Sequence, residues 1–304
     1  MTTKNKLIFD VIIIGGSYSG LAAGMALGRA LKKVLIIDSG KPCNKQTPYS
    51  HNFLTQDGRP PAEIAALSRQ QLIKYGTVEF FDSVAIKGTK TVDGFEIQTA
   101  SGDTFTSVKL IFATGIRDML PGIDGISACW GISVLHCPFC HGYEVKDEIT
   151  GILGNGADVY DLVGLIFNWS KSLTLFTNGP SVLTAGQIAK LKKHAIKIVE
   201  KDIERLEHVN GYVQHIIFRD GTSSPVKALY TRAPFRQHCQ IPEYIGCELN
   251  DEGYLKINPF QETTIEGIFA CGDNTNRIRT VANAVATGTT TGIMVSRQLI
   301  TERF

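Results

Sequence analysis

The sequence has no surplus of either charge and no apolar run long enough to span a bilayer. Among its 304 residues, 31 Lys and Arg face 29 Asp and Glu, so the formal net charge is only +2. A balanced chain gives no electrostatic case for a nucleic acid or an anionic membrane as the main partner. Without a long apolar run, the sequence does not predict a membrane-spanning helix. We therefore expect a small molecule or another protein as the partner.

Paired cysteines are also scarce. The seven cysteines are an odd number and include one close pair, Cys137 and Cys140. This usage argues against a disulfide scaffold and favours the reducing cytoplasm. No second pair of cysteines or histidines stands at ligand spacing, so we expect no metal site. Near the start, Asp10 and Gly15-Gly16 interrupt the apolar run, which favours a buried strand over an export leader.

What the chain does contain begins with a nucleotide-binding pattern. An apolar, β-branched run over Leu7–Ile14 predicts a strand buried on both faces. The turn Gly15-Gly16-Ser17-Tyr18-Ser19-Gly20, a small-residue helix and a second apolar strand, Val34–Ile37, follow. Asp38 ends that strand, about 20 residues beyond the glycines, as a dinucleotide site requires. Glycines let the backbone approach a pyrophosphate and Asp38 can bind a ribose, while Ser17 at the middle glycine position loosens that approach.

A helix and three alternating strands follow this opening. Pro60-Pro61 predicts the start of a helix that ends at Gly76. The strands beyond it are separated by turns at Asp93-Gly94 and Ser101-Gly102. This pattern predicts an antiparallel insertion.

Two further segments read as strands that end in small-residue turns. They are Leu110–Gly115 and Gly267–Asp273, and a long helix is expected from about Val281 to Leu299. With the opening, they resemble the FAD domain of the pyridine-nucleotide–disulfide oxidoreductases, specifically the low-molecular-weight thioredoxin reductases. The resemblance covers nearly the whole chain. It implies an α/β fold with two Rossmann-like, three-layer ββα nucleotide-binding domains, the second inserted in the first, and a homodimer.

The same resemblance implies the domain boundaries and the FAD ligands. Residues 1–116 and 239–304 would form the FAD-binding domain, and residues 117–238 an NAD(P)H-binding-like domain that carries the cysteine pair. Asp38 and the glycine turn would hold the adenosine end of FAD, Asp273 the ribityl–phosphate side, and Asn52 would lie near the isoalloxazine. The full set of expected cofactor-binding residues is Gly15, Ser17, Gly20, Asp38, Asn52, Thr114, Gly115, Gly272, Asp273, Thr280 and Val281.

The inserted domain repeats the nucleotide-type pattern but lacks the groups that discriminate between cofactors. We expect a strand over residues 149–153, a turn over Gly154–Val159, a helix over Tyr160–Asn168 and a strand over Leu173–Phe176. The next stretch, Thr177–Val182, contains no arginine, and no acid ends the strand. A 2′-phosphate without a cation loses hydrogen bonds worth about 1.5–3 kcal/mol each. The acid that would bind the 2′-hydroxyl of NADH is missing too, so we expect neither NADPH nor NADH to be recognised well and NADPH to be used inefficiently.

The cysteine pair carries the expected chemistry. Two thiols separated by two residues can close a reversible disulfide and carry two electrons. The resemblance implies that Cys140 exchanges electrons with the flavin and that Cys137 meets the substrate. His141 stands where the family has an aspartate. Imidazole titrates near neutrality, so it could move protons, or stabilise a thiolate as the imidazolium; a histidine that merely caps the next helix is the alternative. His136 and Glu144 are weaker candidates.

The stretch Cys-Pro-Phe-Cys-His-Gly-Tyr-Glu, residues 137–144, resembles a branch of the family with dithiol oxidases that close disulfides in gliotoxin- and holomycin-type metabolites. These enzymes pass electrons through FAD to oxygen. The motif leaves open an NADPH-dependent reductase of a thioredoxin-like protein or small disulfide, and a non-catalytic flavin and thiol redox sensor. Haem attachment to the CxxCH pattern is disfavoured, because the chain carries FAD motifs and no leader is expected.

Overall fold

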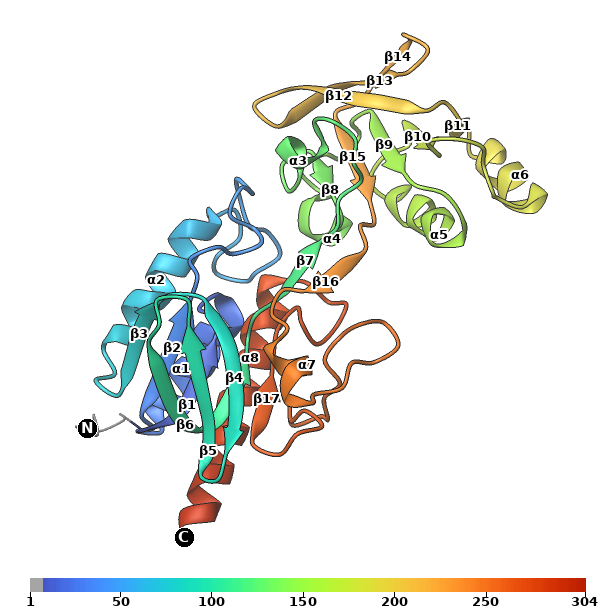
Figure 1. Ribbon diagram of the computed structural model, residues 1–304. Helices are drawn as coiled ribbons and strands as arrows, with labels where there is room; N and C mark the ends of the chain where they lie inside the picture. The colour runs from blue at the N-terminus through green and yellow to red at the C-terminus, as the bar shows by residue number, and fades with distance from the viewer. Residues whose placement is uncertain (1–7) are drawn as a thin grey trace. The chain divides into compact units, whose positions relative to one another are not determined.

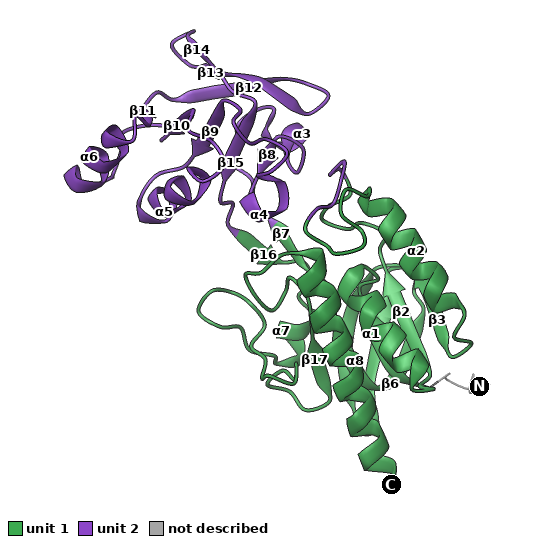
Figure 2. Ribbon diagram, turned by 180° about the vertical axis from the view of Figure 1, so that it is seen from behind, with its two compact units in different colours: residues 1–45, 52–117, 235–304 green, residues 46–51, 118–234 purple. Residues whose placement is uncertain are grey.

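The computed structural model describes residues 8–304 as two compact units (Figure 2). Unit 1 contains the chain up to Lys45, Asn52–Arg117 and Phe235–Phe304. Unit 2 contains Gln46–His51 and Asp118–Pro234. The segments that lead from one unit to the other, β7 (Ile116–Asp118) and β16 (Phe235–Gln237), pair as a two-stranded sheet. Which cofactor each unit holds stays a prediction.

Unit 1 is built on one sheet with the strand order β3-β2-β1-β6-β5-β4, and β17 pairs with β6. Strands β3, β2, β1, β6 and β17 run parallel to one another. Strand β5 pairs antiparallel with β6, and β4 pairs antiparallel with β5. Strand β1 confirms the predicted first strand from residue 8 on; Leu7 lies outside the described residues. The bounds are β1 Ile8–Ile14, β2 Val34–Asp38, β3 Val78–Asp82, β4 Ala85–Thr91, β5 Gly94–Thr99, β6 Thr104–Phe112 and β17 Ile268–Ala270.

Strand β6 joins two features that the sequence analysis treated separately. Its first half pairs antiparallel with β5, which confirms the predicted alternating strands and their turns. Its second half, Leu110–Phe112, pairs parallel with β17, while β1 pairs parallel with residues 106–112 along the other edge of the strand. One continuous strand therefore belongs both to the insertion and to the nucleotide-type sheet. Periodicity alone could not show this continuity, because the partner on one edge of the strand changes from β5 to β17.

Helices α1 (Tyr18–Arg29) and α8 (Val281–Arg303) lie side by side in unit 1 (Figure 1). Small residues allow this close packing. A Cβ on Gly292 would lie 2.5 Å from the main-chain oxygen of Ala23, and one on Gly288 would collide with the main chain at Ser19. The predicted start of α8 is confirmed, and the helix ends at Arg303, beyond the expected Leu299. The predicted helix after Pro60 is α2, Pro61–Ile73.

Unit 2 contains a five-stranded parallel sheet with the order β11-β10-β9-β15-β8. Helix α5 begins at Ala157 rather than at the predicted Tyr160, because the turn already ends at Gly156, whose φ is 92°. An antiparallel sheet of β12, β13 and β14 was not predicted. The elements are α3 Ile126–Cys129, β8 Val134–Leu135, α4 Pro138–His141, β9 Thr150–Leu153, α5 Ala157–Ile166, β10 Leu173–Phe176, α6 Ala185–Lys193, β11 Lys197–Val199, β12 Ile203–Val209, β13 Tyr212–Phe218, β14 Ser223–Pro225 and β15 Ala228–Thr231.

The helices of residues 8–304 include none with both the length and the apolar character needed to cross a membrane. The remaining helix, α7 (Ile241–Ile245), packs near β4 in unit 1.

Candidate redox and nucleotide sites

The glycine turn of unit 1 lies where β1 and β2 end. Gly15 has a φ of 105°, and a Cβ there would collide with the main chain of Ala113. The N–H of Gly16 donates a hydrogen bond of 3.1 Å to Oδ1 of Asp38, which ties the turn to the predicted ribose-binding acid. Ser17 is the N-cap of α1 and makes no side-chain capping hydrogen bond within the described chain. The Ser17 side chain thus does not cap the start of α1, the kind of helix end at which an anionic ligand can bind.

The turn after β6 and the turn after β17 are connected by Asn274. Its side-chain Nδ2 donates to the main-chain oxygen of Phe112 at 2.9 Å and to Oγ1 of Thr114 at 3.4 Å. Its Oδ1 is buried and finds no donor among residues 8–304. Gly272, with a φ of 84°, donates its N–H to Oγ1 of Thr287 at 3.1 Å. The structure therefore brings the predicted residues at 114–115 and 272–273 together and leaves a buried acceptor beside them.

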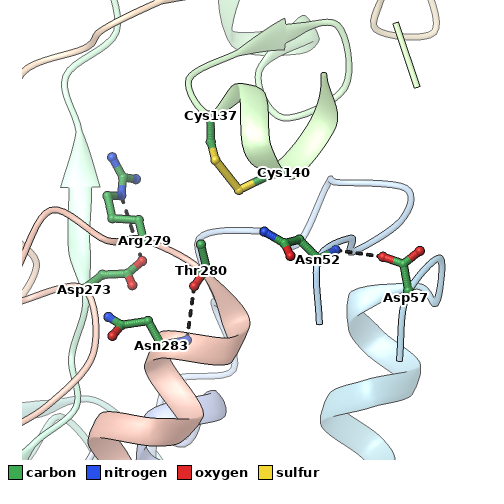
Figure 3. The surroundings of a disulfide bond; sticks show 8 residues. All are labelled: Asn52, Asp57, Cys137, Cys140, Asp273, Arg279, Thr280 and Asn283. Carbon is green, nitrogen blue, oxygen red and sulfur yellow. Dashed lines mark hydrogen bonds and ion pairs between the residues drawn. A yellow bond between two sulfur atoms is a disulfide. The ribbon is translucent and has the colours of Figure 1, made fainter. Parts of the chain in front are cut away.

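Asp273 lies near the amino end of α8. Its Oδ2 is 3.9 Å from Nε of Arg279, and both side chains are mostly buried. Thr280 is the N-cap of α8, and its Oγ1 accepts a 3.1 Å hydrogen bond from the N–H of Asn283 (Figure 3). The side-chain cap satisfies one of the free N–H groups at the helix start. The carboxylate and the helix start thus lie in one part of unit 1.

Asn52 is held in a left-handed conformation, with a φ of 57°. Its N–H donates a 2.7 Å hydrogen bond to Oδ1 of Asp57 (Figure 3). Asparagine tolerates this backbone region better than most residues. The local fold therefore fixes the main chain at Asn52 and leaves its side chain exposed.

The donor set of unit 1 fits FAD. It offers a carboxylate at the end of β2 for ribose hydroxyls, an uncapped helix start for a pyrophosphate, and an orphaned buried acceptor on Asn274 beside Asp273. Each of these groups suits a different part of a dinucleotide. The individual roles of the eleven expected residues stay predictions.

The cysteine pair forms a disulfide in unit 2. Cys137 is the N-cap of the short helix α4 and Cys140 lies within it, which places their Cα atoms 5.3 Å apart (Figure 3). The N–H groups of Cys140 and His141 both donate to the main-chain oxygen of Cys137, at 3.3 Å each. Gly142 ends the helix, where a Cβ would lie 2.9 Å from Nε1 of Trp169. The local turn therefore presents the two sulfurs at bonding distance.

His141 is neutral at physiological pH. Burial, followed by the charge of His51, lowers the pKa of His141 from 6.5 to about 4. The expectation that this imidazole titrates near neutrality is wrong in this environment, because desolvation penalises the charged ring. Its role beside the cysteines stays a prediction. A neutral imidazole can still accept a proton from a thiol.

His51 is the residue that sequence reasoning missed. Its ring lies 6.2 Å from that of His141, centroid to centroid and almost perpendicular, and its Nδ1 lies 3.4 Å from Oε1 of Glu144. His136 instead stacks on Trp130, with centroids 5.8 Å apart. The only sequence signal for His51 is a histidine next to Asn52. Its pairing with the segment after the cysteines depends on how the loop 46–51 folds.

The nucleotide-type turn of unit 2 is tied down by its own side chains. Asn155 donates through Nδ2 to the main-chain oxygen of Pro180 at 2.8 Å, and its Oδ1 accepts from the N–H of Val182 at 3.0 Å. The N–H of Ser181 donates to Oε1 of Glu200 at 2.7 Å. A carboxylate thus accepts the N–H of Ser181, in a stretch that has no arginine to pair with a 2′-phosphate. These residues do not fit NADPH.

Comparisons with known proteins agree with this architecture. The model of the family described as pyridine nucleotide-disulphide oxidoreductase matches residues 9–288. The thioredoxin reductase tcpT of Claviceps purpurea is 32% identical and is aligned over 99% of this chain and 97% of its own. The crystal structure of an oxidoreductase from Agrobacterium tumefaciens has a TM-score of 0.90 at 34% identity and covers 97% of this chain and 99% of its own. That of HlmI has a TM-score of 0.92 at 26% identity, with 100% and 95% covered.

Proposed function

The chain belongs to the pyridine nucleotide-disulphide oxidoreductase family, among its thioredoxin reductase-like enzymes, and we propose that it exchanges electrons between FAD and a thiol or disulfide substrate through Cys137 and Cys140. The observation that carries the proposal is the closed Cys137–Cys140 disulfide followed directly by a neutral His141. The substrate is a thioredoxin-like protein or a small dithiol or disulfide. We further propose that the enzyme is a cytoplasmic homodimer.

The chemistry at the cysteines is thiol–disulfide exchange. A substrate thiolate attacks the sulfur of Cys137, a mixed disulfide forms, and Cys140 leaves as a thiolate. A second substrate thiol then attacks the mixed disulfide and releases Cys137, which takes up the second proton. The substrate leaves as a disulfide, and the cysteine pair has gained two electrons. In the reducing direction the same steps run backwards.

FAD, when bound, supplies a two-electron acceptor or donor for the cysteine pair. The residues proposed to hold it are those of unit 1. The start of α1 and Gly15 would face the pyrophosphate, Asp38 the ribose, and Asp273 with the start of α8 the remaining chain of the cofactor. No proton or sulfur transfer is assigned to these residues.

The oxidising direction, with oxygen as the final acceptor, is the first candidate. The contacts of Asn155 and Glu200 with the stretch 180–182 favour it, since this stretch offers a 2′-phosphate a neighbouring carboxylate and no arginine. The second candidate is an NADPH-dependent disulfide reductase, which the common properties of the family support. The resemblance of residues 137–144 to the dithiol oxidase branch also favours the first.

One anaerobic experiment tests the proposal. The purified flavoprotein is mixed with NADPH, with NADH and with dithiothreitol, and the flavin absorbance is followed. We expect bleaching by dithiothreitol alone and hydrogen peroxide on admitting air. Rapid bleaching by NADPH would instead establish the reductase. Slow reaction with every donor, together with a protein that binds one redox state only, would indicate a redox sensor. A Cys137→Ser variant that reacts as fast as the parent would exclude the cysteine pair as the reaction centre.

A further inference from the structure

An exposed aromatic side chain stands within the cysteine turn of unit 2. Phe139 lies between Cys137 and Cys140 in the short helix α4, and it is 61% exposed. Neighbouring Cα atoms of a chain are about 3.8 Å apart, so the covalent geometry holds Phe139 next to Cys140. The reactive disulfide therefore carries a large apolar side chain that solvent reaches.

The Phe139 ring is supported from one side by Trp169. The two ring centroids are 5.3 Å apart and the rings are perpendicular, a T-shaped arrangement that aromatic pairs prefer. Trp169 follows α5, and its main-chain oxygen accepts a 3.0 Å hydrogen bond from the N–H of Asp147. Gly142 lets the indole approach α4, because a Cβ there would lie 2.9 Å from Nε1 of the indole. The fold thus holds the Phe139 ring while leaving most of it exposed.

The apolar group around Phe139 is small. Tyr143, four residues further along the chain, is 70% exposed, but Nζ of Lys146 lies 4.1 Å from its ring centroid and covers part of it. Residues 144 and 146–148 are charged and exposed. Three rings of about 150–250 Å² each fall short of the roughly 800 Å² per partner that a stable protein interface buries. The group therefore suits a small molecule better than a protein.

We propose that Phe139 is a specificity-determining residue that binds the aromatic ring of a small dithiol substrate while a thiol of that substrate attacks Cys137. The proposal rests on the thiol–disulfide function proposed above and narrows its substrate to dithiols that carry an aromatic ring. The substrate ring displaces water from the exposed part of the Phe139 ring and adds a ring–ring contact. Trp169 is a positioning residue, because it acts by holding Phe139.

Two dithiols of matched chemistry separate ring recognition from thiol exchange. Benzene-1,2-dimethanethiol loses the hydrogens of its two S–H groups and closes a cyclic disulfide, while the Cys137–Cys140 bond breaks to give two thiols. Two electrons and two protons pass from the probe to the cysteine pair. Dithiothreitol reacts in the same way and closes a cyclic disulfide of the same ring size, but it carries no aromatic ring. The ratio of their rates therefore isolates the contribution of the ring.

The test uses both dithiols as reductants of the holoenzyme. The second-order rate constant of anaerobic flavin reduction is measured for each. We expect Phe139→Ser to lower the rate constant for the aromatic dithiol about three- to thirtyfold, and that for dithiothreitol by less than about twofold. Phe139→Tyr retains an aromatic ring and should keep the parent ratio. Phe260→Ser, at a side chain of unit 1 that is 57% exposed, is the matched control and should also keep it.

The positioning role of Trp169 has its own readout. Trp169→Ala should lower the ratio of the two rate constants, and Trp169→Phe should restore much of it, because a phenyl ring can still meet Phe139 edge to face. A general loss of structure would instead slow both dithiols alike. An unchanged ratio in Phe139→Ser would overturn the proposal, as would a loss of rate that appears only with a reduced thioredoxin as the substrate.

Failure of the proposed function is distinguished by the parent enzyme. If dithiothreitol does not reduce the flavin of the parent, the proposed function fails. Recognition of the ring is then read by saturation-transfer NMR of benzene-1,2-dimethanol, which has hydroxyl groups in place of thiols. A signal with the parent that is lost in Phe139→Ser supports the ring-binding role of Phe139, and equal signals would overturn it.

Discussion

The side-chain Nδ2 of Asn155 donates a 2.8 Å hydrogen bond to the main-chain oxygen of Pro180. This bond joins the glycine turn of unit 2 to the stretch that follows β10, where related nucleotide-type folds recognise the far end of a dinucleotide. Because Glu200 also accepts the N–H of Ser181, a negative charge is built into that stretch. The fold of unit 2 is of the nucleotide-binding type, but this stretch carries a carboxylate contact and no arginine.

A gain of NADPH affinity should follow when this charge is reversed. In a Ser181→Arg, Glu200→Gln variant, a new cation and a freed N–H could bind the 2′-phosphate. One charge-assisted hydrogen bond of about 1.5–3 kcal/mol corresponds to roughly a ten- to hundredfold lower dissociation constant. Fluorescence titration with NADPH measures it, and the uncharged Ser181→Gln, Glu200→Gln variant is the matched control. Tight NADPH binding by the parent would contradict the assignment.

The two variants that each keep one cysteine of the pair should differ in how readily they form a stable mixed disulfide. In a Cys140→Ser variant, Cys137 lacks its resolving partner, so an aromatic disulfide reagent should leave a stable mixed disulfide on Cys137. In Cys137→Ser, Cys140 should react more slowly, because the family resemblance assigns it to the flavin side of the pair. Mass spectrometry of the peptide that spans 137–144 gives the stoichiometry. Equal rates of modification in both variants would mean that the assignment of the attacking and resolving sulfurs is wrong.

The contact between α1 and α8 should tolerate no side chain at Gly288. A Gly288→Ala methyl group collides with the main chain at Ser19, and the resulting overpacking should cost about 1–3 kcal/mol of unfolding free energy. Gly164, in α5, has nothing within 4 Å of the same position. Gly164→Ala should therefore stabilise its helix by roughly 0.5–1 kcal/mol. Chemical denaturation compares the two, and equal effects of the same sign would exclude the packing explanation.

Removing the cap of α8 should weaken the start of this helix. Thr280→Ala deletes the oxygen that accepts the N–H of Asn283, at a cost of about 1 kcal/mol. Thr280→Ser keeps a capping hydroxyl and should behave like the parent. Thermal unfolding of the flavin-free protein measures the stability, and FAD titration shows whether cofactor affinity falls with it. A parent-like Thr280→Ala protein in both measurements would show that the cap contributes little.

Stability should fall in acid because His141 is buried in its neutral form. The pKa of His141 is about 4 in the folded protein and about 6.5 in the unfolded chain, so the unfolded state binds more protons between these values. The stabilisation is complete above pH 6.5 and decreases towards pH 4, by at most about 3 kcal/mol at roughly 1.4 kcal/mol per unit. Urea unfolding of the parent and of His141→Gln at several pH values isolates the contribution of His141 to the unfolding free energy. If the unfolding free energies of the two proteins changed with pH in the same way, the burial effect would be disproved.

Local patterns were sufficient to predict the nucleotide-type elements and the reactive cysteines. Strand β1, the glycine turn, Asp38 and the start of α8 each depend on residues close in sequence, whose apolar periodicity and turn chemistry point to one local structure. The same holds for the Cys137–Cys140 disulfide, because three residues of a helical turn bring the two sulfurs together. The missing cation after β10 was also visible in the residues themselves.

The tertiary structure alone decided the protonation state of His141 and the hydrogen bonds that tie the nucleotide-type turn of unit 2 to the segments around it. Burial and the approach of His51 from a distant loop keep His141 neutral, although its sequence neighbours suggested a ring that titrates near neutrality. The hydrogen bonds of Asn155 and Glu200 likewise join segments far apart in the chain. A pKa depends on desolvation and on nearby charges, and both are set by which segments pack together rather than by local sequence. The sequence by itself therefore located the cysteine pair that forms the disulfide, and the fold determined the protonation state of the histidine that follows it.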